Sequence, residues 1–352
     1  MGYATLTIQT GVIQANIKRI KASLKPPTQT MLIVKANAYG LGATPICQSL
    51  EGHVDYFGVA TLDEALQLRN HGITTPILLL SEPLESQFEL ICKQNIDITI
   101  YNKSTIEQLV LFTEKTKETV CTHLKIDTGL NRLGIPWQHA PDLLSYWQQT
   151  PHTILKKGIL SHFANSRSPN HPLNQTQLSR FIDIIPPHCD QLVHFSNSNA
   201  ILNLPDSHFS MVRFGLSAYQ NSFTLTAPVR HIHQIDAHTS VGYDSSYVSD
   251  SSTDIAVIGI GYGDGLSSRL SNQGHVVIGH HQCPIIGKVC MDMLMVQLPK
   301  NHTVGIHDTA IIISPESSPG MSITTVSSLT DQNPREVISC LLPRVSRVYL
   351  SD

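Results

Sequence analysis

The stretch MLIVKANAYGLG, residues 31–42, decides how the fold of this chain is interpreted. Its first four residues are apolar and include β-branched side chains, which is typical of a strand buried on both faces of a sheet. Lys35 follows at once, although a buried and unpaired ammonium group is strongly disfavoured. Small residues come next and leave space beside the amine. The stretch therefore predicts a core strand whose end carries a lysine kept for a function.

The same pattern of a short apolar strand, a polar turn and a helical segment recurs from residue 31 to about residue 216. Eight strands are expected, with the sequences MLIVK, YFGVAT, PILLLS, IDITIY, HLKIDT, GILSHF, LVHFSN and MVRFGL. Eight strand–helix units predict an α/β fold, a (β/α)8 barrel of the TIM type. An open, doubly wound sheet is the alternative, because periodicity does not show whether a sheet closes.

Two of the intervening helices have clear predicted starts. The segment 61–72 begins with Thr61 and Glu64 at the spacing of a capping box and ends at Gly72. The segment 104–115 repeats the device with Ser104 and Glu107. Both patterns predict helices that cover the barrel strands.

After about residue 220 the composition changes to short strand-like pieces separated by glycine, serine and asparagine. These pieces are TDIAVIGIGYG, HVVIG, CPIIGKVC and MLMVQLP, and no long helical pattern follows until the 320s. We therefore expect a barrel domain over residues 1–225 and a mainly β C-terminal domain over residues 226–352. The first strand, ATLTIQT, precedes a helix and can pack with the second domain instead of the first.

Composition excludes several classes of partner. The 352 residues carry a formal charge of −3 and no run of lysine and arginine, so we expect no nucleic-acid partner. No segment reaches the roughly 20 apolar residues of a membrane span, so we expect no membrane partner. The start MGYATLTIQT lacks the basic and apolar regions of a secretory signal.

The seven cysteines are widely spaced and form no CxxC pair, which argues against a disulfide framework and a zinc site. A reducing cytoplasm is the expected location. His231, His233 and His238 could indicate a metal patch, with His231 and His233 on one face of a strand. Neither a carboxylate nor a cysteine joins them at ligand spacing, so no metal is expected.

Polar residues gather where the predicted barrel strands end, and active sites of parallel barrels lie at that end. Each has a structural alternative: the lysine of the first strand could extend to solvent, the acid and arginine near the fifth could form an ion pair, and the histidine could be a satisfied core residue. Their shared position is hard to explain by packing, because a buried polar group needs a partner. The residues are Lys35 after the first strand; Lys125, Asp127 and Arg132 at the fifth; His162 at the sixth; Asn197 and Ser198 at the seventh; and Arg213 in the eighth.

A lysine at a barrel mouth can attack a carbonyl and form a Schiff base. Ser198 and the turn at Gly215 are suited to a phosphate, since a hydroxyl and backbone N–H groups can surround it. Lysine, phosphate site and arginine together indicate pyridoxal 5′-phosphate (PLP). An aldolase that uses a lysine without a cofactor needs many of the same parts, so the residues alone leave both readings open.

Several longer motifs make the chain resemble the alanine racemase family, whose members are PLP enzymes built from a barrel and a β domain. The resemblance covers nearly the whole chain, and its motifs follow one another in the family's order. They are VKANAYGLG, LKIDTGLNRLG, SHFANS, HFSNSNA, MVRFGLSAY, SVGYDSSY, IGIGYGDGLSSRLSNQG and IIGKVCMDMLMVQL.

The resemblance implies roles at matching positions for the reaction. Lys35 would bind PLP covalently and act as one catalytic base. Tyr243 would be the second base, on the opposite face of the substrate and contributed by the partner subunit of a homodimer. Two bases on opposite faces invert a carbon centre without turning the substrate over.

The resemblance also implies binding roles around these two bases. Arg213 would contact the pyridine nitrogen, and His162 would hydrogen-bond Tyr243. Arg132 would lie near the phenolic oxygen and the substrate carboxylate, oriented by Lys125 if that lysine is carbamylated. The remaining implied contacts are Tyr39, Ser198, Gly215 and Leu216 with the phosphate, Asn197 lining that region, the Met291 N–H with the substrate carboxylate, and Tyr262 at the entrance.

The implied function is interconversion of L- and D-alanine, which supplies D-alanine for peptidoglycan. Alternatives are a broad-specificity amino-acid racemase, a PLP-dependent amino-acid decarboxylase and a non-enzymatic PLP carrier. Tyr243 and Arg213 favour a racemase over a decarboxylase, because decarboxylases of this type place a carboxylate at the pyridine nitrogen. The β domain disfavours a carrier.

The chain departs from the family's pattern at several positions. Leu41 stands where many members have His, and Asp244 stands where Gly is common. Ser268 and Lys288 occupy entrance positions that are often Arg. Pro343 stands where some members place a tyrosine on the phosphate, which removes one phosphate donor. The entrance departures bear on substrate breadth rather than on the reaction.

Overall fold

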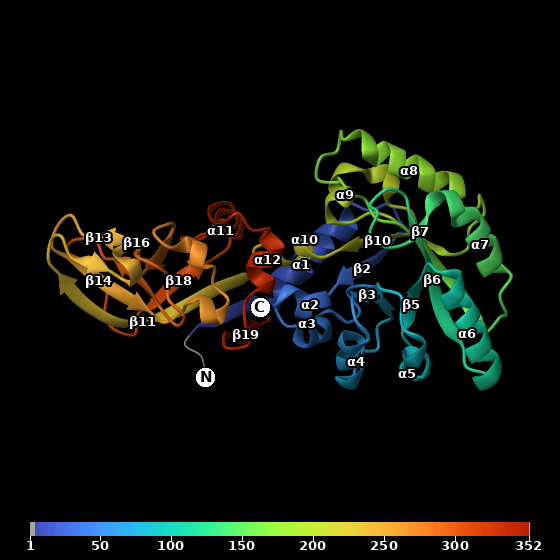
Figure 1. Cartoon of the computed structure of the whole chain (residues 1–352), viewed down its shortest axis with the longest axis horizontal. Coiled ribbons are helices and arrows are strands. Elements are labelled where there is room, and N and C mark those ends of the chain that lie inside the picture. The colour runs from blue at the N-terminus through green and yellow to red at the C-terminus, as the bar shows by residue number, and fades with distance from the viewer. Residues whose placement is uncertain (1–3, 352) are drawn as a thin grey trace. The chain divides into compact units, whose positions relative to one another are not determined.

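The computed structural model describes residues 4–351 and divides into two compact units. One unit comprises residues 14–38 and 43–218. The other comprises the N-terminal segment up to Ile13, residues 39–42 and the chain from Tyr219 onward. Figure 1 labels the elements of both units.

Eight parallel strands of the first unit form a closed barrel. Each strand pairs with the next along the chain, and pairing of β10 with β2 completes the ring. The eight-stranded barrel is therefore confirmed, and the open sheet is wrong. The strands are β2 (Gln29–Ile33), β3 (Tyr56–Val59), β4 (Ile77–Leu79), β5 (Asp97–Ile100), β6 (Val120–Asp127), β8 (Ile154–Leu160), β9 (Leu192–His194) and β10 (Met211–Phe214).

The barrel strands form where the sequence is mostly apolar. Every residue of β3, β4, β5 and β10 is buried, as expected for parallel strands covered on both faces. All eight observed strands end before the predicted ones, because the last predicted residues belong to the segments that follow the strands at the carboxyl end of the barrel.

Helices connect the strands and lie outside them (Figure 1). They are α1 (Thr10–Ala22), α3 (Ala43–Leu50), α4 (Leu62–Asn70), α5 (Phe88–Lys93), α6 (Lys103–Thr116), α7 (Ala140–Gln148), α8 (Pro172–Ile184), α9 (Ser198–Asn203) and α10 (Leu216–Tyr219), with a short strand β7 (Ile135–Pro136). The segment labelled α2 (Lys35–Tyr39) is a left-handed turn rather than an α-helix. Across residues 4–351, none of the helices is long and apolar enough to cross a membrane.

One predicted helix start is confirmed and the other is wrong. Thr61 and Glu64 form the expected capping box of α4. Helix α6 instead begins at Lys103 after Asn102, so Ser104 lies inside the first turn. The Glu82 carboxylate accepts the backbone N–H of Asn102 at 3.0 Å and holds the chain at that point.

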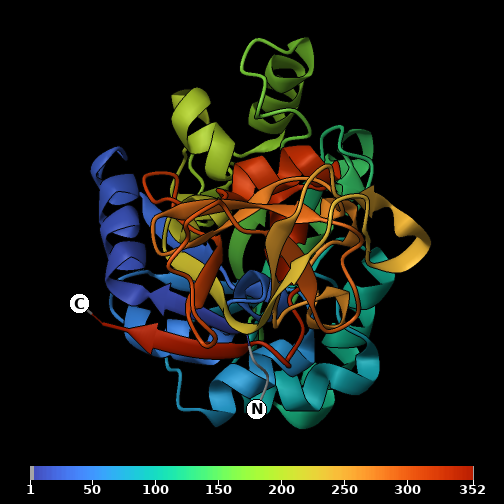
Figure 2. The same cartoon turned by 90° about the vertical axis from the view of Figure 1, so that its left-hand side faces the viewer.

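The second unit is mainly antiparallel β structure, as predicted; its strands from β11 onward appear yellow to red in Figure 2, whereas β1 is blue. The large sheet has the order β14-β17-β16-β15-β18-β11-β1-β19, and β1 pairs with both β11 and β19. The strands are β1 (Thr5–Gln9), β11 (Phe223–Ile235), β14 (Thr253–Ile258), β15 (His275–Ile278), β16 (His281–Ile286), β17 (Leu294–Gln297), β18 (Thr309–Ile313) and β19 (Ser346–Leu350).

Smaller elements complete this unit. A hairpin of β12 (Ser240–Val241) and β13 (Tyr247–Val248) carries Tyr243 in its turn. The expected helices after residue 320 are α11 (Ile323–Thr330) and α12 (Pro334–Ser339). Buried Val241 packs in one apolar cluster with Ile255, Ile286 and Met295, so the hairpin is anchored next to Tyr243.

Candidate active site

The first unit collects most of the predicted site residues at one end of the barrel. Parallel strands present their carboxyl ends together, so residues that follow different strands meet there. Lys35 follows β2, Lys125 lies near the end of β6 with Arg132 in the next turn, His162 follows β8, Asn197 and Ser198 follow β9, and Arg213 precedes the turn with Gly215 and Leu216 after β10.

Lys35 begins a left-handed turn. Residues 36–39 all have φ between 51° and 57°, a conformation that costs roughly 1–2 kcal/mol per non-glycine residue. The Glu64 carboxylate accepts the Ala36 N–H at 2.6 Å, and Val34 accepts the Ala38 N–H at 2.7 Å. Glu64 was predicted only as a helix cap, so its second role was missed.

Cationic side chains surround Lys125, whose side chain is almost fully buried. Burial, together with the charges of Arg213, Arg132 and Lys35, lowers the pKa of Lys125 to about 8. Burial and the same charges, with that of Lys125, hold the pKa of His162 well below its usual range. These five predicted residues therefore lie near one another, and His162 is neutral at neutral pH.

Arg213 is buried and held by fixed acceptors. Its Nη1 donates to the His194 carbonyl at 2.7 Å and to His194 Nδ1 at 2.9 Å. Its Nη2 donates to the carbonyls of Ser161 and Phe195 and lies 3.2 Å from His162 Nδ1. Burial lowers the Arg213 pKa to about 10, which leaves the guanidinium charged at neutral pH.

A buried histidine pair supports Arg213 from inside the barrel. Because arginine only donates, His194 Nδ1 accepts, and its Nε2–H points to His123 Nδ1 at 3.1 Å. His123 Nε2 in turn lies 3.5 Å from Asp97 Oδ2. A Cβ on Gly158 would lie 2.2 Å from His123 Nδ1, so this position requires glycine.

Asp127 shapes the turn that carries Arg132. Its Oδ1 accepts the N–H groups of Gly129, Leu130 and Asn131 at 2.9–3.1 Å, and its Oδ2 accepts the Arg132 N–H at 3.2 Å. The alternative of an Asp127–Arg132 ion pair is wrong, because the carboxylate binds backbone groups instead of the guanidinium. The Arg132 side chain is exposed and remains available to bind an anion.

Gln177 of α8 holds the segment after His162. Its side-chain oxygen accepts the Ala164 N–H at 2.9 Å, and its nitrogen donates to the His162 carbonyl at 3.0 Å and to Thr128 Oγ1 at 3.2 Å. The side chain is fully buried. The sequence analysis missed Gln177, and its one sequence signal is an amide on the buried face of an amphipathic helix.

Polar groups after β9 and β10 lie side by side. Ser198 Oγ accepts the Gly215 N–H at 3.1 Å, and Asn197 Oδ1 caps α9 by accepting the Asn199 and Ala200 N–H groups. Ser217 Oγ is buried and has no hydrogen-bond partner within the described residues. Ser217 was not predicted, and an orphaned buried hydroxyl is typical of a site for a ligand.

The second unit holds Tyr243, Tyr262 and Met291. Tyr243 and Met291 are 68% and 54% exposed, and both line a cavity of about 670 Å³ with Cys290 and Met293. The Tyr262 N–H donates to the Cys290 carbonyl at 3.0 Å, so backbone contact joins Tyr262 to the segment with Met291.

Two further expectations concern this unit. Tyr39 packs its ring 5.6 Å from that of Tyr219, and burial raises the Tyr39 pKa. His231 and His233 share one face of β11 as predicted, with ring centroids 4.9 Å apart. In the part of the chain from residue 4 to residue 351, no three histidine, cysteine or acidic side chains gather as metal ligands.

Comparisons with known proteins cover the whole chain. The family models for the alanine racemase N-terminal and C-terminal domains match residues 8–222 and 222–349. The chain is 34% identical to alanine racemase 1 of Caldanaerobacter subterraneus, over 97% of this chain and 93% of that protein. It is 30% identical to alanine racemase 2 of Oceanobacillus iheyensis, over 96% of this chain and 91% of that protein.

Solved structures agree with the sequence comparison. The E. faecalis alanine racemase superposes with a TM-score of 0.93 at 26% identity, covering 99% of this chain and 98% of that one. The alanine racemase of Bartonella henselae, with covalently bound pyridoxal phosphate, superposes with a TM-score of 0.89 at 29% identity. The match covers 99% of this chain and 100% of that one. The chain is therefore an enzyme of the alanine racemase family, which uses PLP.

Proposed function

We propose that this enzyme interconverts L- and D-alanine with PLP held on Lys35. The observation that carries the proposal is the arrangement at the barrel mouth, where Lys35, Lys125, Arg132 and Arg213 lie close enough for their charges to act on one another. Four cations gathered at one end of the barrel fit a ligand with several negative charges. A substrate carboxylate and a cofactor phosphate supply those charges.

The residues of the barrel mouth fit PLP. The Lys35 amine provides the covalent attachment. Arg213 provides a charged donor for the ring nitrogen through its Nε–H, because the hydrogen bonds of Arg213 within this unit use Nη1 and Nη2. Ser198 Oγ, the Gly215–Leu216 turn and the orphaned Ser217 hydroxyl are suited to a phosphate. We assign Asn197 to the rim of this phosphate site. We assign the Tyr39 hydroxyl as a further hydrogen-bond donor to the phosphate.

PLP, when bound, withdraws electrons from Cα of the substrate and so acidifies its proton. We assign Lys35 to the face from which the D-alanine proton leaves, and Tyr243 of the partner subunit to the face from which the L-alanine proton leaves. Each base returns a proton to its own face after the other has removed one. This exchange inverts Cα without turning the substrate over.

Other side chains bind and orient. Arg132 and the Met291 N–H are assigned to the substrate carboxylate, and Tyr262 to the entrance. His162 is neutral and lies against Arg213, which suits it to accept or donate a hydrogen bond to the tyrosine base. Arg213 donates only, so it holds the ring nitrogen without giving it a proton.

We further propose that Lys125 is carbamylated. A neutral amine reacts with carbon dioxide, and burial among cations keeps part of Lys125 neutral near neutral pH. The carbamate would replace a positive charge by a negative one beside Arg132 and Arg213. That exchange removes repulsion between like charges and orients Arg132.

The second unit supports a homodimer. Tyr243, Met291 and Met293 are large and exposed, and they line one cavity. Exposed apolar side chains gathered around a cavity mark an interaction surface. We infer that a second copy of the chain covers this surface and that each active site uses residues of both subunits.

For the cell, we propose that the enzyme supplies D-alanine for peptidoglycan from the cytoplasm. The relatives named above come from bacteria, and a family of alanine racemases provides the D-enantiomer that cell walls contain. The spread of seven unpaired cysteines agrees with a reducing compartment.

Proton NMR of L-alanine with the purified enzyme and PLP in D2O tests the function. We expect the Cα–H signal to disappear while the carbon skeleton stays intact, with D-alanine found on a chiral column. A persistent Cα–H signal would exclude alanine as substrate. Exchange with larger amino acids at similar rates would favour a broad-specificity racemase, and loss of carbon dioxide a decarboxylase.

A further inference from the structure

The turn that carries Tyr243 has a conformation that must be held in place by its surroundings. Gly242, Asp244 and Ser245 have φ values of 75°, 59° and 48°. Non-glycine residues in this region cost free energy and persist where neighbouring structure fixes them. Residues 242–246 are called the Tyr243 turn below, and all five residues are exposed.

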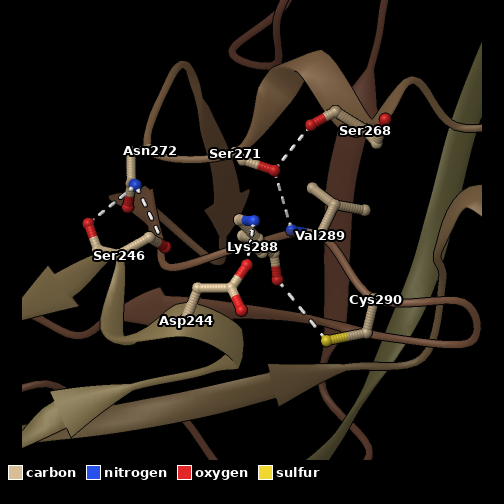
Figure 3. A network of polar contacts seen from close by, with 8 residues as sticks. All are labelled: Asp244, Ser246, Ser268, Ser271, Asn272, Lys288, Val289 and Cys290. Carbon is tan, nitrogen blue, oxygen red and sulfur yellow. Dashed lines mark hydrogen bonds and ion pairs between the residues drawn. The ribbon is translucent and has the colours of Figure 1, made fainter.

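The first contact of the Tyr243 turn is an ion pair. Lys288 Nζ contacts Asp244 Oδ2, and Figure 3 shows the two side chains pointing toward each other. The Lys288 and Asp244 side chains are 46% and 72% exposed, so the pair contributes little to the overall free energy of unfolding. Its effect is local, on the position of the turn.

Asp244 joins a backbone feature and an ion pair at this turn. The backbone at position 244 is left-handed, a conformation that favours glycine. Aspartate tolerates this conformation better than most residues, and it adds a carboxylate that the Lys288 ammonium binds. Asp244 and Lys288 therefore form one coupled feature of this chain.

Asn272 is the second contact, and it joins the Tyr243 turn to the segment 287–291. Its Nδ2 donates to the Ser246 carbonyl at 3.1 Å, and its Oδ1 accepts the Gly287 N–H at 2.6 Å. Its own N–H donates to the Gly287 carbonyl at 3.2 Å. One side chain thus holds both segments, as Figure 3 shows for the bond to Ser246.

The segment 287–291 is itself fixed, so it can serve as a support. Ser271 Oγ accepts the Val289 N–H at 3.0 Å and donates to the Ser268 carbonyl at 2.5 Å (Figure 3). A Cβ on Gly287 would lie 2.7 Å from the Val241 carbonyl, so the two backbones are in close contact. Met291 lies at the end of this segment.

We propose that Asn272 and the Asp244–Lys288 ion pair are positioning residues that set Tyr243 against the segment with Met291. The proposal rests on the function proposed above, in which Tyr243 is a base and the Met291 N–H binds the substrate carboxylate. A displacement of about 1 Å in such a geometry can cost a hundredfold in rate. The three residues are assigned a role through Tyr243, because the contacts described above join its turn to the segment 287–291.

Hydrogen–deuterium exchange of the holoenzyme tests the contacts without using activity. We expect Asn272→Ala and Lys288→Gln to speed exchange in peptides covering residues 240–248 and 285–292 about tenfold. Lys288→Arg keeps the ion pair and should match the wild type, as should Lys300→Gln, which removes an exposed lysine of the same unit. Unchanged exchange in both Asn272→Ala and Lys288→Gln would overturn the proposal.

The rate at which alanine loses its Cα proton in D2O then tests whether Asn272 and the ion pair position Tyr243. The steady-state ratio kcat/KM cannot show which face is affected. The equilibrium constant between the enantiomers is one, so kcat/KM must be equal for L-alanine and D-alanine. We expect Asn272→Ala and Lys288→Gln to slow initial proton loss from L-alanine about tenfold and from D-alanine less than twofold. Equal slowing for both enantiomers would overturn positioning of Tyr243. Absence of exchange in the wild type would refute the proposed function, while the deuterium-exchange result would still decide the contacts.

Discussion

At the scale of the residue, the chemistry depends on side chains whose surroundings change their protonation. Lys125 is a plain lysine in the sequence, yet burial and three neighbouring cations lower its pKa to about 8. An ordinary lysine with a pKa of about 10.4 is less than about 1% neutral at pH 8. Lys125 is about half neutral there, which is the condition for reaction with carbon dioxide.

We therefore predict that Lys125 forms a carbamate as the pH rises through about 8 at constant carbon dioxide pressure. The sign follows from the lowered pKa, because loss of the ammonium proton exposes the nucleophilic amine. A carbamate resonance should appear in ¹³C NMR with labelled bicarbonate and be missing in Lys125→Met. Lys157→Met, which removes an exposed lysine, should keep the resonance. A resonance that survives Lys125→Met would assign the carbamate elsewhere.

At the scale of the element, the turn after β2 shows how a strained segment is held. Four consecutive non-glycine residues of positive φ follow Lys35, and the Glu64 carboxylate accepts the first N–H of that turn. The same carboxylate accepts the Ala60 N–H at 2.7 Å and the Thr61 N–H at 3.3 Å. One side chain therefore starts α4 and holds the turn that follows Lys35.

Removing this carboxylate should weaken the attachment of PLP. A hydrogen bond to a charged group contributes about 1.5–3 kcal/mol, so Glu64→Ala should lower PLP affinity about tenfold or more. Glu64→Gln retains one acceptor oxygen and should lose less. Titration of the apoenzyme followed by visible absorbance measures the affinity, with Glu85→Ala as a matched control at another helix start. Equal PLP affinity of Glu64→Ala and the wild type would show that the turn after Lys35 keeps its conformation without the Glu64 carboxylate.

At the scale of the whole molecule, the proposed dimer has a strict consequence. If each active site combines Lys35 of one subunit with Tyr243 of the partner subunit, two inactive variants can complement each other. Random pairing of Lys35→Ala with Tyr243→Phe makes half of the dimers mixed, and each mixed dimer has one intact site. Co-refolded mixtures should therefore regain about a quarter of wild-type racemase activity.

The same experiment has a clear contrary outcome. If both bases come from one chain, neither subunit of a mixed dimer has a complete site, and the mixture stays inactive. Native mass spectrometry separates the mixed dimer from the two parent dimers by mass, so a negative result can be assigned to site composition rather than to failed pairing.

Much of the architecture was predictable because it follows from local patterns. All eight barrel strands were predicted from short, mostly apolar segments that alternate with polar turns and helical segments, and the capping box of α4 from two residues. The start of α6 was predicted wrongly, because Glu82 holds Asn102 from another part of the chain. Local signals fail where a distant side chain decides.

By itself, the sequence determined the order of strands and helices, the change to β structure after about residue 220 and the residue types that reach the barrel mouth. Periodicity and turn chemistry are local, so they can be interpreted along the chain. Only the tertiary structure decided that the sheet closes and that Asp244 meets Lys288. It also decided that Glu64 holds the turn after Lys35, Gln177 the segment after His162 and Asn272 the Tyr243 turn. Contacts between distant residues depend on the packing of the entire fold, and the pKa of Lys125 depends on charges that only this packing brings together.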